Sequence, residues 1–214
     1  MKFHRSQLLI YAVTDRAWTG RQSLLWQVEA ALKGGATMVQ LREKELNSEN
    51  VDLFLEEALA IRRLTEHYGV PFLIDDNLEL AQKCGADGIH VGQNDMDAAL
   101  ARKFLGPDKI LGVTAKTPQQ ARKAQADGAD YLGSGAIFGT STKADAKPMT
   151  RELLSAICAS VSIPVVAIGG ISLENIHGLA GTGVAGAAIV SGIFASENIE
   201  ETTRQLVEKM QKNL

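Results

Sequence analysis

The sequence predicts a single (β/α)8 barrel spanning residues 1–214, because a turn that recurs four times separates helical patterns from short apolar runs. The turn lies in the segments GGATMVQ, CGADGIH, DGADYLG and TGVAGAA, whose second residues are Gly35, Gly85, Gly128 and Gly183. These glycines are 50, 43 and 55 residues apart, and one strand–helix unit of a barrel commonly takes ~25 residues. Each interval therefore accommodates two units, which predicts eight units in the whole chain.

The predicted strands are short runs that are apolar on both faces, as parallel strands buried between two layers are. Four of them are LLIYAVTD, VPFLIDD, KILGVTA and IPVVAIGG, which end at Asp15, Asp76, Ala115 and Gly170. The other four are Thr37–Leu41, Gly88–Val91, Tyr131–Ala136 and Ala187–Val190.

Amphipathic stretches with apolar residues at helical spacing separate these strands. They are Leu24–Leu32, Val51–Leu64, Leu78–Lys83, Ala98–Phe104, Pro118–Ala126, Thr150–Cys158, Leu173–Leu179 and Ile199–Met210. A doubly wound open sheet is the alternative, but it rarely uses eight such even repeats, and no Gly-x-Gly-x-x-Gly follows the first strand. No linker rich in Pro, Gly or Ser divides the chain.

The composition argues against several classes of function. Lys and Arg number 22 against 25 Asp and Glu, so no basic excess indicates nucleic acid or an anionic membrane as a partner. No run approaches the ~20 apolar residues of a membrane span, and Leu8–Val13 is shorter than the apolar core of a signal peptide. Cys84 and Cys158 lie in or beside helical patterns, as core residues do. We expect a cytoplasmic protein that acts on small molecules. The sequence leaves open whether it forms a homo-oligomer.

The active site of a barrel lies at the carboxyl ends of its strands, and the second strand ends in VQLREK. Gln40, Arg42 and Lys44 alternate there and therefore share one face. A solvated loop is the ordinary fate of such charges. A strand buried on both faces, however, should carry alternating polar groups only where they line a site. A guanidinium and an ammonium in one cavity suit a polyanion such as diphosphate.

Carboxylates follow the third and fourth predicted strands. Asp75 and Asp76 end the third strand, and Asp95 follows the fourth. Asp76 and Asp95 each precede a helical pattern, so either could simply cap its helix. The ends of neighbouring parallel strands meet, however, and two carboxylates can share one hard cation. Mg²⁺ commonly takes one or two protein carboxylates and completes its shell with water and phosphate oxygens. Together with the basic exit of the second strand, this favours a magnesium site at Asp76 and Asp95.

The remaining strand ends predict further anion contacts. Thr114 offers a hydroxyl after the fifth strand. After the sixth, Thr140, Ser141 and Thr142 precede Lys143 in a loop suited to wrapping an anion. Paired glycines ending at Gly170, and Val190-Ser191 after the eighth strand, match the usual phosphate site of barrels.

His90 alone among the four histidines lies in a predicted strand, where we interpret it as a structural, hydrogen-bonded residue. No Ser/His/Asp or Cys/His arrangement is evident, so the sequence does not indicate nucleophilic catalysis. Two anion sites and a metal instead predict displacement of pyrophosphate by a second, phosphorylated substrate, since a metal stabilises the charge on the leaving diphosphate.

The ordered motifs YAVTD, VQLREK, IDDNLELA, GIHVGQND, FGTSTK, VVAIGGI and IVSGIF resemble those of thiamine phosphate synthases over nearly the whole chain. The resemblance implies a (β/α)8 barrel that joins hydroxymethylpyrimidine diphosphate to a thiazole phosphate, with or without an extra carboxylate, and releases pyrophosphate. It implies Mg²⁺ as cofactor and a dissociative displacement through a pyrimidinyl cation.

The resemblance also implies roles for matching positions. Gln40, Leu41, Arg42, Glu43 and Lys44 would hold the pyrimidine diphosphate, with Asp75 and Thr114 at the pyrimidine and Lys143 at the diphosphate. Asp76 and Asp95 would bind Mg²⁺. Thr140, Ser141, Thr142, Gly170, Val190 and Ser191 would hold the thiazole phosphate. We take Arg42, Thr114 and Lys143 as the residues that act on the reacting groups.

Two positions depart from the family pattern, because the family often has Asn where this chain has Asp75 and favours Pro where it has Gly139. Three other functions compete. A thiazole tautomerase or a non-catalytic phosphate-binding barrel would not need the diphosphate site. A phosphosugar isomerase would need a catalytic acid–base pair that we cannot point to.

Overall fold

Eight parallel strands close into a barrel, and each strand pairs with its neighbours in chain order until β8 pairs with β1. This computed structural model describes residues 3–43, 45, 51–139 and 148–214. The strands are β1 (Ile10–Val13), β2 (Met38–Leu41), β3 (Phe72–Asp75), β4 (Gly88–Val91), β5 (Ile110–Thr114), β6 (Tyr131–Gly135), β7 (Val165–Ile168) and β8 (Gly186–Ile189). The predicted barrel is confirmed.

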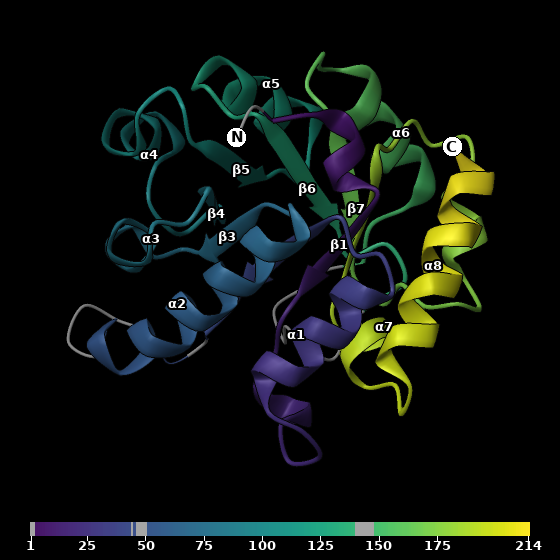
Figure 1. The fold of residues 1–214 in the computed structure, drawn as a ribbon. Coiled ribbons are helices and arrows are strands. Elements are labelled where there is room, and N and C mark those ends of the chain that lie inside the picture. Colours follow the sequence, from purple (N-terminus) through teal and green to yellow (C-terminus); the bar gives the residue numbers. More distant parts are fainter. Residues whose placement is uncertain (1–2, 44, 46–50, 140–147) are drawn as a thin grey trace.

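Helices surround the strands, and α8 lies beside α1, so that the last helix completes the ring (Figure 1). The α-helices are α1 (Leu24–Lys33), α2 (Val51–Tyr68), α3 (Leu78–Cys84), α4 (Ala98–Leu105), α5 (Pro118–Ala126), α6 (Arg151–Ala159), α7 (Ser191–Phe194) and α8 (Ile199–Asn213). Short 3₁₀ helices are η1 (Arg5–Leu8), η2 (Arg16–Trp18) and η3 (Ile176–Leu179).

One predicted helix is wrong, and one short helix was not predicted. The stretch Leu173–Leu179 forms only the 3₁₀ turn η3. The Asn175 side chain accepts a hydrogen bond from the Ser172 backbone at 2.9 Å, a local bond that competes with a regular helix. The unpredicted helix α7 follows β8 directly. Several strands also end one or two residues before the predicted limit, because the chain turns there into the loops at the carboxyl end of the barrel.

The repeated glycine turn has a conformational cause. Its four glycines have positive φ angles, at Gly35 (95°), Gly85 (69°), Gly128 (95°) and Gly183 (88°). Residues with a side chain rarely adopt this left-handed region. Each glycine therefore lets the chain reverse sharply between a helix and an even-numbered strand.

The residue two positions after the turn glycine ties neighbouring strands together in three of the four repeats. Its side chain accepts a backbone amide hydrogen from the preceding odd-numbered strand: Thr37 from Ile10 at 3.0 Å, Asp87 from Phe72 at 2.9 Å, and Asp130 from Leu111 at 2.8 Å. In the fourth repeat the position is Ala185. These side chains fix the strand register at the amino end of the barrel, opposite the strand ends where a site is expected.

Two layers of apolar residues make up the core. Tyr11, Met38, Leu73, Ile110 and Val166 belong to a cluster that fills the barrel interior. A larger cluster packs the outer faces of the strands against the helices. Alternate residues of each strand serve the two layers, as the two-residue period of a strand requires.

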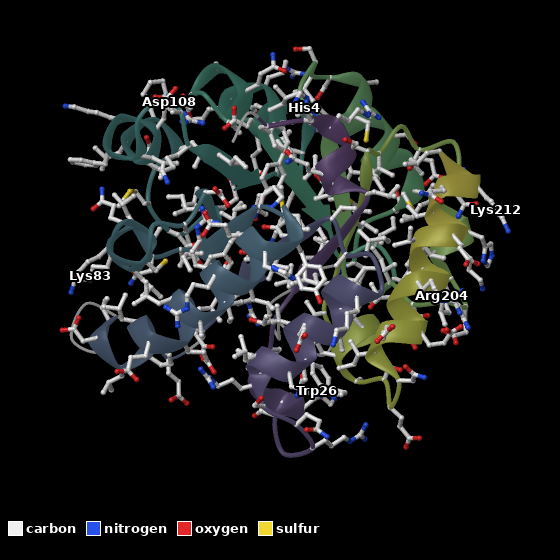
Figure 2. All side chains as sticks on the ribbon, in the orientation of Figure 1. His4, Trp26, Lys83, Asp108, Arg204 and Lys212 are labelled. Atoms are coloured by element: carbon white, nitrogen blue, oxygen red, sulfur yellow. The ribbon has the colours of Figure 1, made fainter. Side chains whose placement is uncertain are left out.

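Charged side chains cover the outside of the helical ring. The labelled side chains of His4, Lys83, Asp108, Arg204 and Lys212 project outward, and all five residues are exposed (Figure 2). Within the described parts of the chain, no helix combines the length and apolarity that crossing a bilayer requires.

We expect Arg102→Ala to lower the free energy of unfolding by ~2 kcal/mol, because its charged hydrogen bonds to half-buried acceptors disappear. From α4, the Arg102 guanidinium donates to the carbonyls of Gly106 and Gly128 at 2.7 and 3.0 Å and to Asp130 at 2.6 Å. Chemical denaturation measures the change. The exposed neighbour Lys103 supplies the control, since Lys103→Ala should change stability by less than ~0.5 kcal/mol. Equal effects of the two changes would contradict this role.

Candidate functional site

A cavity opens at the carboxyl ends of the strands, where the active site of a barrel is expected. Nine of the residues predicted from the sequence line it: Gln40, Arg42, Asp75, Asp76, Asp95, Thr114, Gly170, Val190 and Ser191. They come from β2, β3 and β5 and from the segments that follow β2, β3, β4, β7 and β8. The structure therefore brings together residues that lie up to 151 positions apart in the sequence.

The polarity of the cavity follows from the two-residue period of the strands. In β2, Met38 belongs to the apolar interior of the barrel, whereas Gln40 and Arg42, two and four residues later, line the cavity. In β5, Ile110 likewise belongs to the apolar interior, whereas Thr114, four residues later, lines the cavity. Inward-facing positions thus change from apolar to polar toward the carboxyl end, which puts polar groups only where a ligand can reach them.

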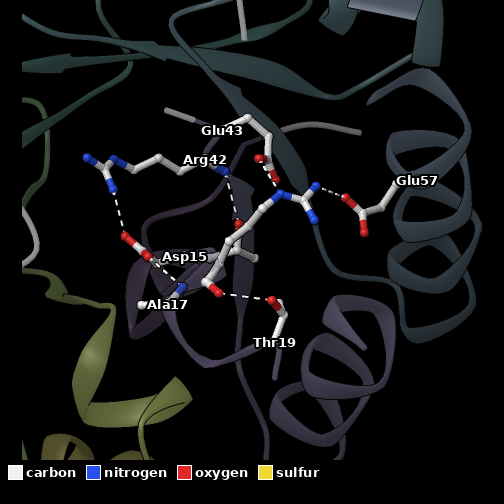
Figure 3. Close-up of polar contacts among 8 residues, drawn as sticks. Asp15, Ala17, Thr19, Arg42, Glu43 and Glu57 are labelled. Atoms are coloured by element: carbon white, nitrogen blue, oxygen red, sulfur yellow. Dashed lines mark hydrogen bonds and ion pairs between the residues drawn. The ribbon is translucent and has the colours of Figure 1, made fainter. Parts of the chain in front are cut away.

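Arg42 is held between two carboxylates at the wall of the cavity. Its Nη1 lies 3.1 Å from Asp15 Oδ2, and its Nε lies 3.5 Å from Asp75 Oδ2. Its backbone N–H donates to Thr14 Oγ1 at 3.0 Å, and Figure 3 shows the Arg42 side chain extended toward Asp15. A half-buried guanidinium fixed in this way presents its charge in a defined place for an anion.

Leu41 and Glu43 point away from the cavity, because they occupy the alternate positions of the same segment. Leu41 packs in the outer core layer. Glu43 Oε2 lies 2.6 Å from Arg16 Nε, and the same guanidinium binds Glu57 (Figure 3). Burial raises the pKa of the Glu43 carboxyl, although Arg16 opposes the shift. Any contact of these two residues with a ligand would therefore involve main-chain atoms, and it stays a prediction.

The interpretation of Asp76 and Asp95 as helix caps is wrong. Asn77 caps α3 by accepting the Leu80 N–H, and Asp97 caps α4 by accepting the N–H groups of Ala99 and Leu100. Asp76 and Asp95 instead converge on one donor. Asp76 Oδ1 lies 3.2 Å and Asp95 Oδ2 2.9 Å from the backbone nitrogen of Gly92.

Within the part of the chain that the structure describes, Arg42 pairs with Asp15 and Asp75, and neither Asp76 nor Asp95 has an ion pair with Lys or Arg. Burial, followed by the nearby charges of Asp75 and Asp95, raises the pKa of Asp76 to about 8. The Asp76 backbone has a φ of 56°, a left-handed conformation found at no other described residue except glycines. No three His, Cys, Asp or Glu side chains of the described residues gather as ligands of one ion. A pair of carboxylates that share a single N–H fits a hard cation completed by water and phosphate.

Close backbone contacts shape the opposite wall of the cavity. Gly170 has a φ of 65°, and a Cβ atom added there would lie 2.2 Å from the carbonyl oxygen of Gly139. A Cβ added at Gly192 would lie 2.2 Å from the carbonyl oxygen of Ile171. The exits of β6, β7 and β8 therefore meet through glycines, which brings Gly170, Val190 and Ser191 to one side of the cavity.

Some lining residues were missed, and some predicted ones lie outside the described residues. Tyr11, His90 and Lys116 line the cavity. The spacing of two residues from Thr114 could have indicated Lys116, and His90 was expected only as a structural residue. The His90 imidazole is hydrogen-bonded as expected, to Thr114 and Tyr131 at 3.0 Å each. It also lies in the wall of the cavity, which was not expected. Five residues predicted for the site lie outside the described residues: Lys44, Thr140, Ser141, Thr142 and Lys143.

Comparison with known proteins gives one consistent result. The family model described as thiamine monophosphate synthase matches residues 10–193. A thiamine-phosphate synthase of Clostridium botulinum is 48% identical over 203 residues, covering 95% of this chain and 94% of that protein. Thiamine-phosphate synthase 2 of Streptococcus pneumoniae is 44% identical over 207 residues, 97% of each chain. The structure of a thiamine phosphate pyrophosphorylase from Pyrococcus furiosus superposes with a TM-score of 0.89 at 35% identity, over 98% of each chain.

We expect Gly170→Ala to lower the free energy of unfolding by roughly 1–3 kcal/mol, because a side chain is forced into a left-handed conformation against the Gly139 carbonyl. Gly20→Ala is the matched control, since an added Cβ meets nothing within 4 Å there. Thermal or chemical unfolding of the two variants decides the point. If Gly170→Ala unfolded like the control, the close approach of the β6 and β7 exits would be refuted.

Proposed function

Because the chain belongs to the thiamine monophosphate synthase family, a family of transferases, we propose that it joins hydroxymethylpyrimidine diphosphate to a thiazole phosphate. The bond between the pyrimidine methylene carbon and the diphosphate oxygen breaks, and the diphosphate leaves with the electron pair. The thiazole nitrogen then bonds to the methylene carbon. The products are thiamine phosphate and pyrophosphate, and no proton is gained or lost at the reacting atoms.

The observation that carries this proposal is the division of one cavity into two unlike ends. Arg42, Asp76 and Asp95 follow the neighbouring strands β2, β3 and β4, and these positions form one end. Gly170 and Ser191 follow β7 and β8 on the other side of the barrel, and they form the other end. The first end suits a diphosphate with its cation, and the second has the position of the usual phosphate site of barrels, after strands 7 and 8. A transferase that acts on one diphosphate and one monophosphate needs both ends in the same cavity.

Asp76 and Asp95 would hold Mg²⁺, because their carboxyl groups converge on one backbone N–H at the wall of the cavity. When bound, the ion would neutralise charge on the diphosphate and so make it a better leaving group. Arg42 lies across the same end of the cavity and would hold the diphosphate oxygens. Asp75, ion-paired with Arg42 at 3.5 Å, would accept a hydrogen from the pyrimidine amino group. Lys44 and Lys143 complete the proposed diphosphate site.

The proposed displacement is dissociative and uses no protein nucleophile. The two cysteines support this, since neither lines the cavity. Burial raises the pKa of the Cys84 thiol and raises that of Cys158 to about 11, so both remain protonated and poorly nucleophilic. The cavity residues would instead orient the two substrates so that the thiazole nitrogen faces the methylene carbon, which is the contribution that positioning makes to catalysis.

An endpoint assay tests the proposed function. Purified protein is mixed with hydroxymethylpyrimidine diphosphate and thiazole phosphate in the presence of Mg²⁺ or EDTA, and thiamine phosphate is oxidised to its fluorescent thiochrome derivative. We expect product only in the tube with Mg²⁺. Absence of product in both tubes, with folded protein, would refute the proposed synthase.

We expect Asp95→Ala to reduce turnover by roughly two orders of magnitude, as loss of an electrostatic stabiliser does. Excess Mg²⁺ should restore part of the activity, because the ion would keep Asp76 as a ligand. Titration of turnover against Mg²⁺ concentration gives the answer. Asp97→Ala removes a neighbouring carboxylate that caps α4 and lies 3.5 Å from Lys123, so it should cost about 1 kcal/mol of stability without altering the Mg²⁺ dependence. An identical Mg²⁺ dependence in Asp95→Ala and wild type would remove Asp95 from the metal site.

We expect Ser191→Ala to raise the KM for the thiazole phosphate roughly tenfold, the value of one hydrogen bond to a charged group. The KM for the pyrimidine diphosphate should stay the same, because that substrate would occupy the other end of the cavity. Ser160→Ala is the control, since the Ser160 hydroxyl bonds the Ile157 carbonyl at 2.8 Å and does not line the cavity. A change confined to the pyrimidine diphosphate would show that the two ends were assigned in reverse.

A further inference from the structure

Five polar side chains from five strands form a hydrogen-bonded chain across the barrel interior, which we call the relay. Gln40 Nε2 donates to the Tyr11 hydroxyl at 2.6 Å, and the Tyr11 and Tyr131 hydroxyls are 3.0 Å apart. The Tyr131 hydroxyl lies 3.0 Å from His90 Nδ1, and His90 Nε2 lies 3.0 Å from Thr114 Oγ1. The relay therefore connects Gln40 and Thr114, two lining residues that the sequence assigned to the substrate.

The number of hydrogens on each group fixes a direction along the relay. Tyr11 accepts a hydrogen from the Gln40 amide, so it gives its own hydrogen to Tyr131. Tyr131 must then donate to His90 Nδ1, which leaves the proton of a neutral imidazole on Nε2. His90 Nε2–H donates to Thr114, and the Thr114 hydroxyl hydrogen is left to point away from His90. Thr114 lines the cavity, so this hydrogen is available to a ligand.

The barrel buries the two tyrosines of the relay and makes room for it. Tyr11 and Tyr131 are fully buried, and burial raises the pKa of both hydroxyls, so they keep their hydrogens. A Cβ atom at Gly112 would lie 2.3 Å from the Tyr131 hydroxyl and 2.5 Å from His90 Nδ1. Only glycine at that position leaves space for this contact. Buried hydrogen-bond networks whose members are all satisfied hold one arrangement rigidly.

We propose that Tyr11, Tyr131 and His90 are positioning residues that hold Thr114 as a hydrogen-bond donor toward a ring-nitrogen acceptor of the pyrimidine substrate. The same relay turns the amide nitrogen of Gln40 toward Tyr11, so the amide oxygen faces elsewhere. The relay would therefore select a ring that offers an acceptor to Thr114. The identity of the substrate in this assignment rests on the proposed function. The direction of the relay is independent of the proposed function.

The tautomer of His90 tests the direction without any substrate. Nitrogen-15 NMR of the whole protein distinguishes protonated from bare imidazole nitrogens, and His90→Gln identifies the His90 signals among the four histidines. We expect the proton on Nε2 and a bare Nδ1. A proton on Nδ1 with a bare Nε2 would overturn the proposal, because the Tyr131 hydroxyl would then accept and the Thr114 hydroxyl would have to donate to His90. Protons on both nitrogens would overturn the direction of the relay at Tyr131.

Substitution of the tyrosines tests the consequence for the substrate. Tyr131→Phe removes the hydrogen that holds Nδ1 bare, so the tautomer should become mixed. The KM for the pyrimidine diphosphate should rise roughly fivefold to tenfold, the value of one hydrogen bond, with that for the thiazole phosphate unchanged. Tyr11→Phe keeps the Tyr131–His90 bond, so it should keep the tautomer and have a smaller effect. Tyr68→Phe, the same change on α2 outside the cavity, should alter neither quantity.

A substrate analogue separates positioning from a general loss of structure. Wild-type protein should discriminate strongly against a pyridine analogue in which carbon replaces the ring nitrogen, and Tyr131→Phe should discriminate roughly fivefold to tenfold less. Unchanged discrimination in folded Tyr131→Phe would overturn the proposal. If Tyr131→Phe does not fold, the His90 tautomer in the wild-type protein and the tautomer and KM of Tyr11→Phe still test the proposal. Inactive wild-type protein with the expected tautomer would refute the proposed function alone, and active protein with the opposite tautomer would refute the relay alone.

Discussion

The site depends on the mutual repulsion of three carboxylates, those of Asp75, Asp76 and Asp95, at one end of a cavity. Asp75 has a cationic neighbour in Arg42, but Asp76 and Asp95 converge on a single backbone N–H. Burial and this crowding raise the pKa of Asp76 to about 8. Such an arrangement is unfavourable for the folded protein by itself, and perturbed carboxyls of this kind are concentrated where chemistry is done.

The rest of the barrel places this charge opposite a second anion site and keeps the space between them ordered. Inward positions of β2 and β5 are apolar at the amino end and polar at the carboxyl end, so charge is confined to the cavity. Below it, Tyr11, Tyr131 and His90 connect Gln40 to Thr114. The proposed reaction needs little else, because two phosphorylated substrates held face to face react with each other and not with the protein.

Much of this could be predicted from the sequence, because the signals were local. The glycine turns before β2, β4, β6 and β8 repeat with a spacing that fits eight units, and alternation along β2 identified Gln40 and Arg42. The failures required information from distant residues. Asp76 and Asp95 could not be distinguished from helix caps until Asn77 and Asp97 were seen to occupy those positions. The sequence predicted that His90 is hydrogen-bonded, but its partners, Tyr131 and Thr114, come from other strands and could not be identified from the sequence.

Calorimetric titration of the wild-type protein with inorganic pyrophosphate, in Mg²⁺ and in EDTA, tests the central claim most directly. Without a cation, the described part of the site offers the bare anion mainly Arg42, which is already paired with Asp15 and Asp75, whereas a cation between Asp76 and Asp95 should attract it. We therefore predict binding in Mg²⁺ and little or none in EDTA. Equally tight binding under both conditions would show that the basic residues hold the diphosphate unaided, and it would contradict the magnesium site.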